Sequence, residues 1–194
     1  NDYFSYDFYK EDKFLLKFFF RHFLNKILKL NLDKKNPKFV IFNQDYVSND
    51  ILIDGFYELK ELKLLAKWLK NKIKFGVVLD VGAYIGNHSM FFSRYFKKVI
   101  SFEPNPLSFE LLKLNSKNSK NIKINNYGLS NKTSVKKFYS YDFNYGGSSV
   151  VKNKKIPHKK FNVLFNQFEK LKIKEKIDLV KIDVEGDEIN VLKG

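Results

Sequence analysis

Three short stretches of this sequence carry acidic side chains that could hold a cofactor or take part in catalysis. They are residues 77–86, which read VVLDVGAYIG, residues 102–106, which read FEPNP, and residues 181–188, which read KIDVEGDE. In each, the acid follows an apolar run typical of a strand buried in a parallel sheet. Because such sheets bind ligands at the carboxyl ends of their strands, these stretches predict a cofactor-binding α/β enzyme.

The turn after the first strand has the glycines that close approach to a cofactor requires. Gly82 and Gly86 supply backbone freedom, and a helix that starts at Asn87 points its N-terminal amides at the ligand. Glu103 ends the second strand, 21 residues after Gly82. A carboxylate at a spacing of roughly 20 residues accepts hydrogen bonds from ribose hydroxyls, so Glu103 is predicted to bind a ribose.

The same turn discriminates between two cofactors that both contain adenosine. NAD needs a Gly-x-Gly-x-x-Gly turn for its pyrophosphate, whereas this chain has Tyr84 in place of a middle glycine and Asp80 just before the turn. The Asp80 carboxylate would repel a pyrophosphate and attract the ammonium and sulfonium groups of S-adenosylmethionine. The alternative interpretation is that Asp80 only caps the turn.

The candidate catalytic residues are Asp183 and Glu185, which follow the last predicted strand, and His88, in the first turn of the helix after Gly86. If the group that accepts the methyl is a hydroxyl, a carboxylate or a His must take its proton, or a divalent metal must lower its pKa. The sequence does not choose among them. Each candidate also has a structural alternative. One acid could cap a helix, Asp183 could pair with Lys181, and His88 could be part of the cavity wall.

These motifs resemble the FkbM-type S-adenosylmethionine-dependent methyltransferases over roughly residues 39–194. The resembling stretches are residues 80–88, 102–106, 111–115, 146–149, 181–186 and 191–194. The resemblance implies an α/β fold with a Rossmann-like class I methyltransferase sheet, and methyl transfer to an oxygen of a small molecule, a sugar or a surface glycan. The family normally continues beyond the position of Gly194 into outer strands, so a C-terminally truncated fragment or a short form is expected.

The resemblance also assigns residues to parts of S-adenosylmethionine. The residues that would hold its methionine part are Asp80, Gly82, Ala83 and Gly86. Glu103 would hold the ribose, and the residues near the adenine would be Asn105, Asn126 and Tyr127. Tyr84 stands where the family commonly has Asn, and it is expected to narrow the same pocket.

Apolar periodicity predicts the elements that position these residues. Strands are predicted near residues 77–81, 99–103, 122–127 and 177–182, joined by helices in right-handed crossovers. Residues 133–140 and the segment near Val150 predict an antiparallel flap. Residues 39–42 and 50–53 predict a β-hairpin, and residues 57–70 predict a helix. We therefore expect an N-terminal helical and hairpin extension over residues 1–74 and a cofactor-binding domain over residues 75–194.

Composition limits the chemistry and the partners. The chain has no Cys, which excludes thiolate catalysis and Cys-ligated zinc. Its net charge of +15 comes almost entirely from lysines spread along the chain, which we interpret as a solvated surface rather than a nucleic-acid site. Two alternative classes are a nucleic-acid methyltransferase and a non-catalytic binding module. The first lacks support, because residues 183–186 do not contain the Asn/Asp-Pro-Pro-aromatic stretch that stacks on a flipped base.

Residues 13–30 predict a mostly apolar helix with a narrow basic stripe. The stripe consists of Lys13, Lys17, Arg21, Asn25 and Lys29, spaced four residues apart. We expect this helix to pack against the domain or against a second subunit of a homo-oligomer, and the alternative is peripheral docking on an anionic membrane. No apolar run approaches the roughly 20 residues that cross a bilayer, and no signal pattern is present, so the sequence predicts a cytoplasmic protein.

Overall fold

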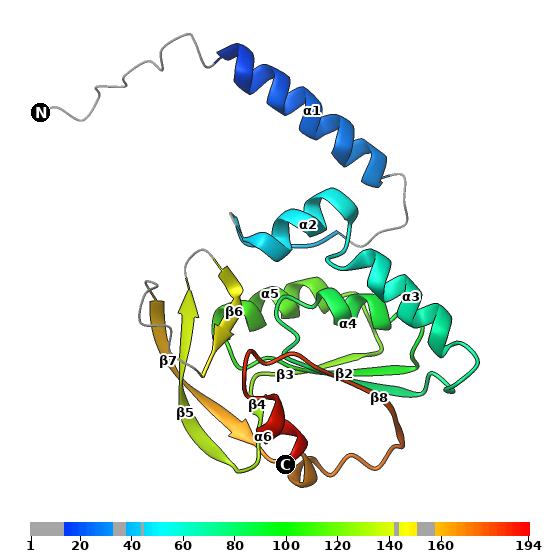
Figure 1. The fold of residues 1–194 in the computed structure, drawn as a ribbon, viewed down its shortest axis with the longest axis vertical. Helices are drawn as coiled ribbons and strands as arrows, with labels where there is room; N and C mark the ends of the chain where they lie inside the picture. Colours follow the sequence, from blue (N-terminus) through cyan, green and yellow to red (C-terminus); the bar gives the residue numbers. More distant parts are fainter. Residues whose placement is uncertain (1–13, 33–37, 44, 142–143, 151–157) are drawn as a thin grey trace, which may run out of the picture. The chain divides into compact units, whose positions relative to one another are not determined.

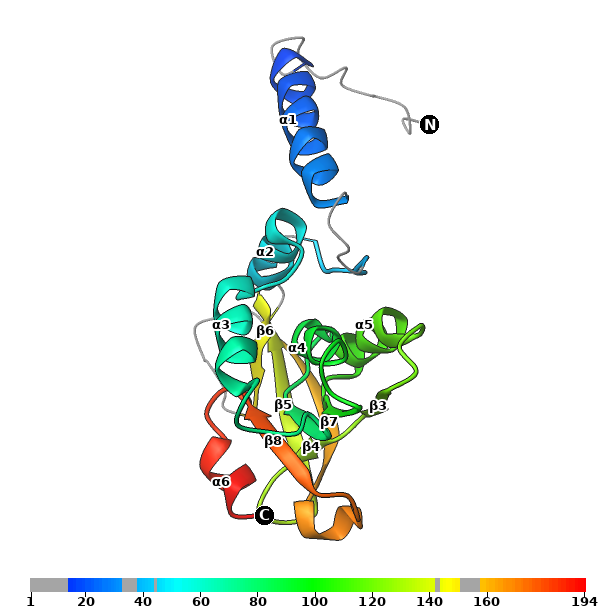
Figure 2. The same ribbon diagram turned by 90° about the vertical axis from the view of Figure 1, so that its right-hand side faces the viewer.

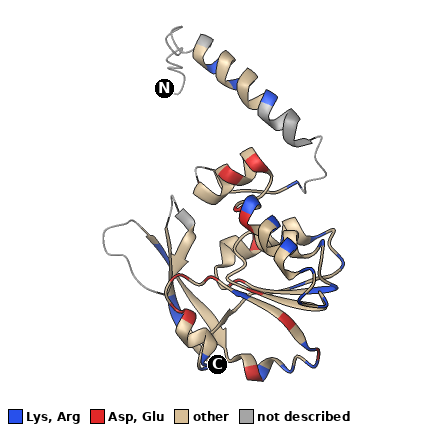
Figure 3. Cartoon of the chain, turned by 45° about the vertical axis from the view of Figure 1, so that its right-hand side comes forward, with Lys and Arg blue, Asp and Glu red and all other residues tan. Residues whose placement is uncertain are grey.

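The chain forms two compact units, Asn1–Asn36 and Pro37–Gly194. The computed structural model describes residues 14–32, 38–43, 45–141, 144–150 and 158–194. In the first unit these residues form helix α1 (Phe14–Leu32), which confirms the helix predicted from residues 13–30. Figure 3 shows basic residues along this helix and no acidic ones in its described part. Among the helices of the described residues, none has both the length and the apolar character required to cross a bilayer.

The second unit contains a parallel sheet of four strands in the order β3-β2-β1-β8. These strands are β1 (Val77–Val81), β2 (Lys98–Phe102), β3 (Ile122–Asn125) and β8 (Ile177–Ile182). All four lie where the sequence predicted strands. The helices of this unit are α2 (Tyr46–Asp54), α3 (Leu59–Leu69), α4 (Asn87–Phe92), α5 (Pro106–Ser116) and α6 (Glu188–Leu192), with a short 3₁₀-helix at Phe168–Leu171.

The parallel sheet is covered on both faces, and this explains its apolar strands. Every residue of β1 is buried. On one face Val78 and Val99 pack with Phe56 and with aromatic residues of α4, and on the other Leu79 and Ile100 pack with Val191 of α6. Figure 1 shows α3, α4 and α5 above this sheet and α6 below it. The result is a Rossmann-like α/β fold, as the sequence predicted.

A second sheet of four strands has the order β4-β7-β5-β6. Its strands are β4 (Gly128–Leu129), β5 (Ser134–Tyr141), β6 (Asn144–Ser149) and β7 (His158–Asn166). The pairs β5–β6 and β5–β7 are antiparallel, which confirms the predicted flap. Figure 2 shows β6 below α2. Residues of β6 line the same cavity as the loops after β1 and β8, so the flap lies near the carboxyl ends of these parallel strands.

The predicted β-hairpin of residues 39–42 and 50–53 is wrong. Residues 50–53 lie inside α2, which Asp45 caps by accepting the Ser48 N–H at 2.9 Å and which Gly55 ends in a left-handed conformation (φ 83°). Residues 39–42 form no strand either. The N–H and C=O of Val40 are bound instead by the side-chain amide of Asn115. The predicted division of the chain at residues 74 and 75 stays a prediction.

Candidate functional site

A cavity of about 250 Å³ lies at the carboxyl ends of β1 and β8. Its floor and one side come from the loops after β1, β2 and β8, and its other walls come from the second sheet and from the segment around α2. Residues of the glycine turn and the two acidic stretches that line it are Gly82, Ala83, Tyr84, His88, Glu103, Lys181, Asp183, Glu185 and Asp187. The sequence therefore located the cavity correctly, since ligands bind at this edge of a parallel sheet.

The turn between β1 and α4 holds its shape through hydrogen bonds to the neighbouring strand. The N–H groups of Gly82 and Ala83 both donate to the carbonyl of Phe102 at 3.0 Å. Gly82 and Gly86 have φ values of 78° and 94°, a region that favours glycine. A Cβ on Gly82 would lie 1.8 Å from the carbonyl oxygen of Asp183, so the turn and the loop after β8 touch here.

Tyr84 occupies the same turn with a left-handed backbone (φ 52°). Its ring stacks on Phe42, with centroids 5.9 Å apart, and forms part of the cavity wall. Burial and the charge of Asp45 raise the pKa of the Tyr84 phenol, so the phenol stays protonated. These contacts place Tyr84 between the cavity and the segment that precedes α2, and its narrowing of the pocket stays a prediction.

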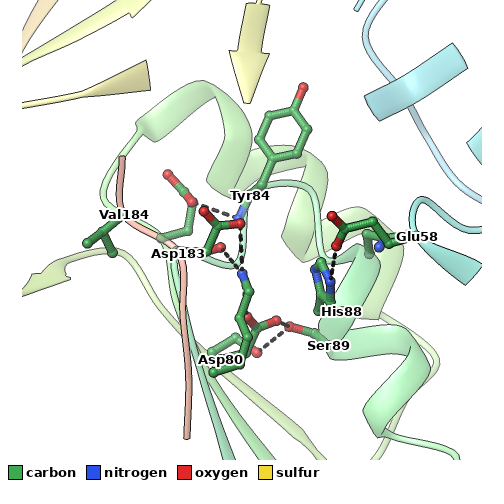
Figure 4. Close-up of polar contacts among 12 residues, drawn as sticks. Glu58, Asp80, Tyr84, His88, Ser89, Asp183 and Val184 are labelled. Carbon is green, nitrogen blue, oxygen red and sulfur yellow. Dashed lines mark hydrogen bonds and ion pairs between the residues drawn. The ribbon is translucent and has the colours of Figure 1, made fainter. Parts of the chain in front are cut away.

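Beneath the cavity, a row of polar side chains crosses three strands of the parallel sheet. Asp80 is fully buried and pairs in register with Ser101 on one side and Lys181 on the other. The Asp80 Oδ2 accepts the Ser89 hydroxyl at 2.6 Å, and Oδ1 lies 3.3 Å from Lys181 Nζ as an ion pair (Figure 4). Asp80 does not line the cavity. Its charge already has a partner in Lys181, and this ion pair fixes the end of β1 beneath the glycine turn.

Lys181 connects this buried row to the loop after β8. Its Nζ donates to the Gly82 carbonyl at 2.9 Å and lies 3.5 Å from Oδ2 of Asp183. The sequence suggested only the Lys181–Asp183 pair. The structure shows that the same ammonium contacts Asp80, Gly82 and Asp183. A single, partly buried cation thus holds the carboxyl ends of β1 and β8 together.

Glu103 is buried in the cavity wall, with only 5 % of its surface exposed. Its Oε2 accepts the N–H of Tyr84 and its Oε1 accepts the N–H of Asn105, both at 2.7 Å. Burial raises the pKa of Glu103 to about 7, although the two backbone donors act in the opposite direction. Each oxygen keeps a lone pair that can accept a hydroxyl from a ligand.

Asn105, predicted near the adenine, serves the fold in another way. Its Oδ1 accepts the N–H of Leu107 at 3.1 Å and so caps α5. Its Nδ2 donates to the hydroxyl of Ser140 at 3.2 Å, which ties α5 to the second sheet. Asn105 does not line the cavity. Its side chain instead fixes the backbone at the start of α5, next to Glu103.

Asn126 and Tyr127 follow β3, and the structure places neither in the cavity lining. The Asn126 Nδ2 donates to the carbonyl of Glu103 at 2.9 Å. Tyr127 packs its ring on Phe102, with centroids 5.6 Å apart, and lines a separate hollow of about 90 Å³. Asn126 therefore supports the backbone of Glu103. The Tyr127 side chain packs on the face of the sheet that α6 covers.

The acidic residues after β8 form one side of the cavity mouth, and Figure 3 shows acidic residues along this segment. Asp183 and Glu185 both line the cavity, and the Asp183 side chain is 57 % exposed. Burial and the neighbouring Asp183 raise the pKa of Glu185. Neither acid caps α6. Asp187 instead lies at the start of that helix and pairs with Lys136 at 2.9 Å.

His88 lies in the opposite wall of the cavity, and its imidazole Nε2 is 3.3 Å from Oε2 of Glu58 (Figure 4). Burial and the charge of Lys181 lower the pKa of His88, which keeps the imidazole neutral near pH 7. The sequence did not single out Glu58, because it lies 30 residues before His88 and no motif marks it. Tyr46 and Tyr57, which also line the cavity, were missed for the same reason.

The described residues contain no group of three or more His, Cys, Asp or Glu side chains that could hold a metal ion. The carboxylates near the cavity are instead spread over two sides, with Asp183 and Glu185 in its lining and Glu58 outside the lining, behind His88. Lys181 also lies among them and neutralises part of their charge.

The parallel sheet, the glycine turn and the carboxylates in the cavity wall together define a Rossmann-like α/β fold with a cavity at its strand ends, the place where such folds bind their ligands. The family profile described as Methyltransferase FkbM domain matches residues 80–194, more than half of the sequence. The chain therefore belongs to the FkbM methyltransferase family, as its motifs predicted. No curated protein matches the sequence.

Proposed function

We propose that this protein transfers the methyl group of S-adenosylmethionine to a hydroxyl oxygen of a small molecule or a sugar. The observation that carries the proposal is Glu103, a buried carboxylate in the cavity wall, beside the Gly82 turn and at the end of β2. A carboxylate in this position suits the paired hydroxyls of a ribose, because both of its oxygens retain acceptor capacity.

The remaining cavity residues fit the other parts of this cofactor. S-adenosylmethionine supplies an electrophilic methyl group on a positively charged sulfur. Gly82 and Ala83 would admit its methionine part, and the carboxylates of Asp183 and Glu185 give that side of the cavity a negative charge suited to a cation. Phe138 and Phe165 of the second sheet add apolar wall where a planar base could pack.

The acceptor would enter between the segment around α2 and the loop after β8. The residues around this entrance are Tyr46, Tyr57, His88, Asp183 and Glu185. Burial and the charge of Glu58 raise the pKa of Tyr57 to about 12, so its phenol remains a hydrogen-bond donor. Hydroxyl and carboxylate groups of this kind suit a polyhydroxyl acceptor. The same carboxylates would repel phosphates, which argues against a nucleic-acid substrate despite the net charge of +15.

Isothermal titration with S-adenosylhomocysteine, with NAD in the same buffer, tests the cofactor. We expect micromolar binding, on the order of −8 kcal/mol, for S-adenosylhomocysteine alone. Binding of NAD, or no binding of S-adenosylhomocysteine by a folded sample, would contradict the proposed cofactor. Circular dichroism of the same sample establishes that it is folded.

The pH dependence of this affinity provides a second prediction. Because the pKa of Glu103 is about 7 and its ionised form is the stronger acceptor, the affinity for S-adenosylhomocysteine should rise about tenfold from about pH 6 to about pH 8. Glu103→Gln should remove this rise and weaken binding at the higher pH by about tenfold. A Glu103→Gln variant that keeps the wild-type pH profile would contradict the ribose assignment.

The control for that experiment is Glu110→Gln, at an exposed acid on α5. It should leave both the affinity and the pH profile unchanged. Linkage gives a further check without ligand. A carboxyl whose pKa rises on folding contributes stability that is present below its unfolded pKa and is lost as pH rises toward about 7. Relative to Glu103→Gln, the wild type should therefore lose stability over this range and not above it.

A further inference from the structure

Glu58 and His88 form a side-chain pair beside the cavity, and neither residue is among those assigned to the cofactor. Nε2 of His88 lies 3.3 Å from Oε2 of Glu58, and the two side chains are 13 % and 45 % exposed. The imidazole lines the cavity, whereas Glu58 approaches it from outside the lining. Figure 4 shows His88 with Glu58 on one side and the Asp183 group on the other.

The backbone that carries Glu58 is held tightly against the start of α4. The Asn87 side chain binds both backbone groups of Tyr57, accepting its N–H at 3.0 Å and donating to its carbonyl at 3.1 Å. Phe56 is fully buried in the core. Glu58 then adopts a left-handed backbone (φ 55°), which costs energy for a residue with a side chain. Strain of this kind, held in place by its surroundings, is common at functional sites.

We propose that Glu58 is a positioning residue that holds His88 with its Nε2–H toward the carboxylate, so that Nδ1 takes the proton of a neutral aliphatic hydroxyl, such as that of a sugar. This proposal rests on the proposed methyl transfer and names the class of its acceptor. The carboxylate fixes the tautomer of the imidazole and stabilises the imidazolium that forms.

The step balances without another reactant. The acceptor oxygen forms a bond to the methyl carbon while the carbon–sulfur bond breaks, and the sulfur keeps that electron pair and becomes a neutral thioether. The hydroxyl proton moves to Nδ1 of His88, which becomes an imidazolium beside Glu58. Proton loss to solvent then restores the neutral imidazole.

The charges around His88 favour this role. Burial and Lys181 lower its pKa, while Asp80, Glu58 and Asp183 act in the opposite direction. The imidazole is therefore neutral before the reaction and gains stabilisation from three carboxylates when it is protonated. A phenol or a carboxylic acid would not need such a base, because it loses its proton more easily than an aliphatic alcohol does.

The aromatic residues beside the pair suit a sugar. Tyr46 and Tyr57 lie edge to face, with centroids 6.1 Å apart, and both line the cavity. Their rings offer an apolar surface for the C–H face of a sugar, and their hydroxyls offer hydrogen bonds to its edge. A sugar acceptor thus suits both the proposed base, His88, and the aromatic wall formed by Tyr46 and Tyr57.

Nitrogen NMR of imidazole-labelled protein tests the tautomer without an acceptor. The chain has three histidines, and a His88→Gln spectrum assigns the signal. With S-adenosylhomocysteine present at about pH 7, we expect neutral His88 with its proton on Nε2, and a lower pKa in Glu58→Gln. A proton on Nδ1, a charged ring, or a signal unchanged in Glu58→Gln would overturn the proposal.

Methyl transfer to two probes tests the base and the acceptor class. The probes are methyl α-mannoside, a neutral sugar with aliphatic hydroxyls, and 4-nitrophenol, which ionises near neutral pH without the help of a base. We expect His88→Gln to lower transfer to the sugar at least 100-fold and Glu58→Gln to lower it about tenfold, with transfer to the phenol spared. Equal loss on both probes, or wild-type transfer to the phenol alone, would overturn the proposal.

Two controls separate this result from failure of the cofactor site. Glu61→Gln makes the same change in the first turn of α3, at an exposed side chain outside the cavity, and should leave both rates unchanged. Titration with S-adenosylhomocysteine should give wild-type affinity for Glu58→Gln. If the wild type does not bind S-adenosylhomocysteine, the proposed function is refuted. The NMR experiment would still test the Glu58–His88 pair.

Discussion

Gly82→Ala is expected to destabilise the protein by about 3 kcal/mol or more and to abolish measurable cofactor binding. The added methyl would lie 1.8 Å from the carbonyl oxygen of Asp183, so the loop after β8 would have to move away from the turn. Ala is also strained at a φ of 78°. Thermal unfolding should show a fall in Tm of about 10 °C, since 1 kcal/mol corresponds to roughly 2–4 °C for a chain of this size.

Gly86→Ala is the matched control for this effect. Its backbone is also left-handed (φ 94°), but the new methyl would meet only Cδ1 of Leu112, at 2.8 Å, and this side-chain end can turn aside. We expect a loss of about 1–2 kcal/mol, from backbone strain and a small repacking of α5. Equal losses for the two variants would show that contact with the loop after β8 is not what makes Gly82 essential.

Lys181→Met should have the second large effect, a loss of about 3–5 kcal/mol. The substitution keeps most of the side-chain volume but leaves the fully buried Asp80 without its counter-charge. It also removes the hydrogen bond to the Gly82 carbonyl, so the affinity for S-adenosylhomocysteine should fall at least tenfold. Urea unfolding measures the first effect and calorimetric titration measures the second.

A double variant isolates the contribution of the buried charge. Asp80→Asn with Lys181→Met removes both charges, and we expect it to be more stable than Lys181→Met alone, because no unpaired charge remains. Lys98→Met is the control, since Lys98 pairs with Glu175 at the surface and should cost no more than about 1 kcal/mol. If the double variant were the less stable of the two, another contact of Asp80 would have to explain the loss.

The parallel sheet could be predicted from the sequence because its strands are buried on both faces. Runs such as residues 77–81 have no polar alternation, and few other elements give that pattern. The glycine turn after the first strand and the acid after the second are also typical of this architecture, whereas the strand order comes from the structure. The edge of the sheet at which the cavity lies was therefore predictable, although four residues assigned to the cofactor do not line the cavity: Asp80, Asn105, Asn126 and Tyr127.

The partners of the site residues could not be predicted in the same way. Asp80 meets Lys181 because β1 and β8 are neighbours in one register, and no sequence pattern gives that register. Glu58 reaches His88 only because Glu58 itself has a left-handed backbone, which turns the chain just before α3. Side-chain pairing of this kind depends on tertiary geometry, so sequence spacing identified His88 but not the acid beside it.

The wrong hairpin shows how short apolar runs mislead. The run Ile51-Leu52-Ile53 suits a strand, yet Asp45 and Gly55 provide caps at both ends of a helix. The caps satisfy backbone groups locally, whereas a hairpin would have needed a partner for residues 39–42. The Asn115 amide takes the backbone groups of Val40 instead, so no ladder forms.

The pairing of β1 with β8 determines when the site can appear during folding. Val77 and Ile177 are partners across the sheet, and the Lys181–Gly82 hydrogen bond joins residues 99 positions apart. Closing so long a loop costs entropy, which only the finished contacts offset. The second sheet lies between β1 and β8 in the chain, so its formation shortens the loop that remains to be closed. During synthesis on the ribosome, the glycine turn emerges long before its support from β8. The cavity at the ends of β1 and β8 is therefore completed late in folding.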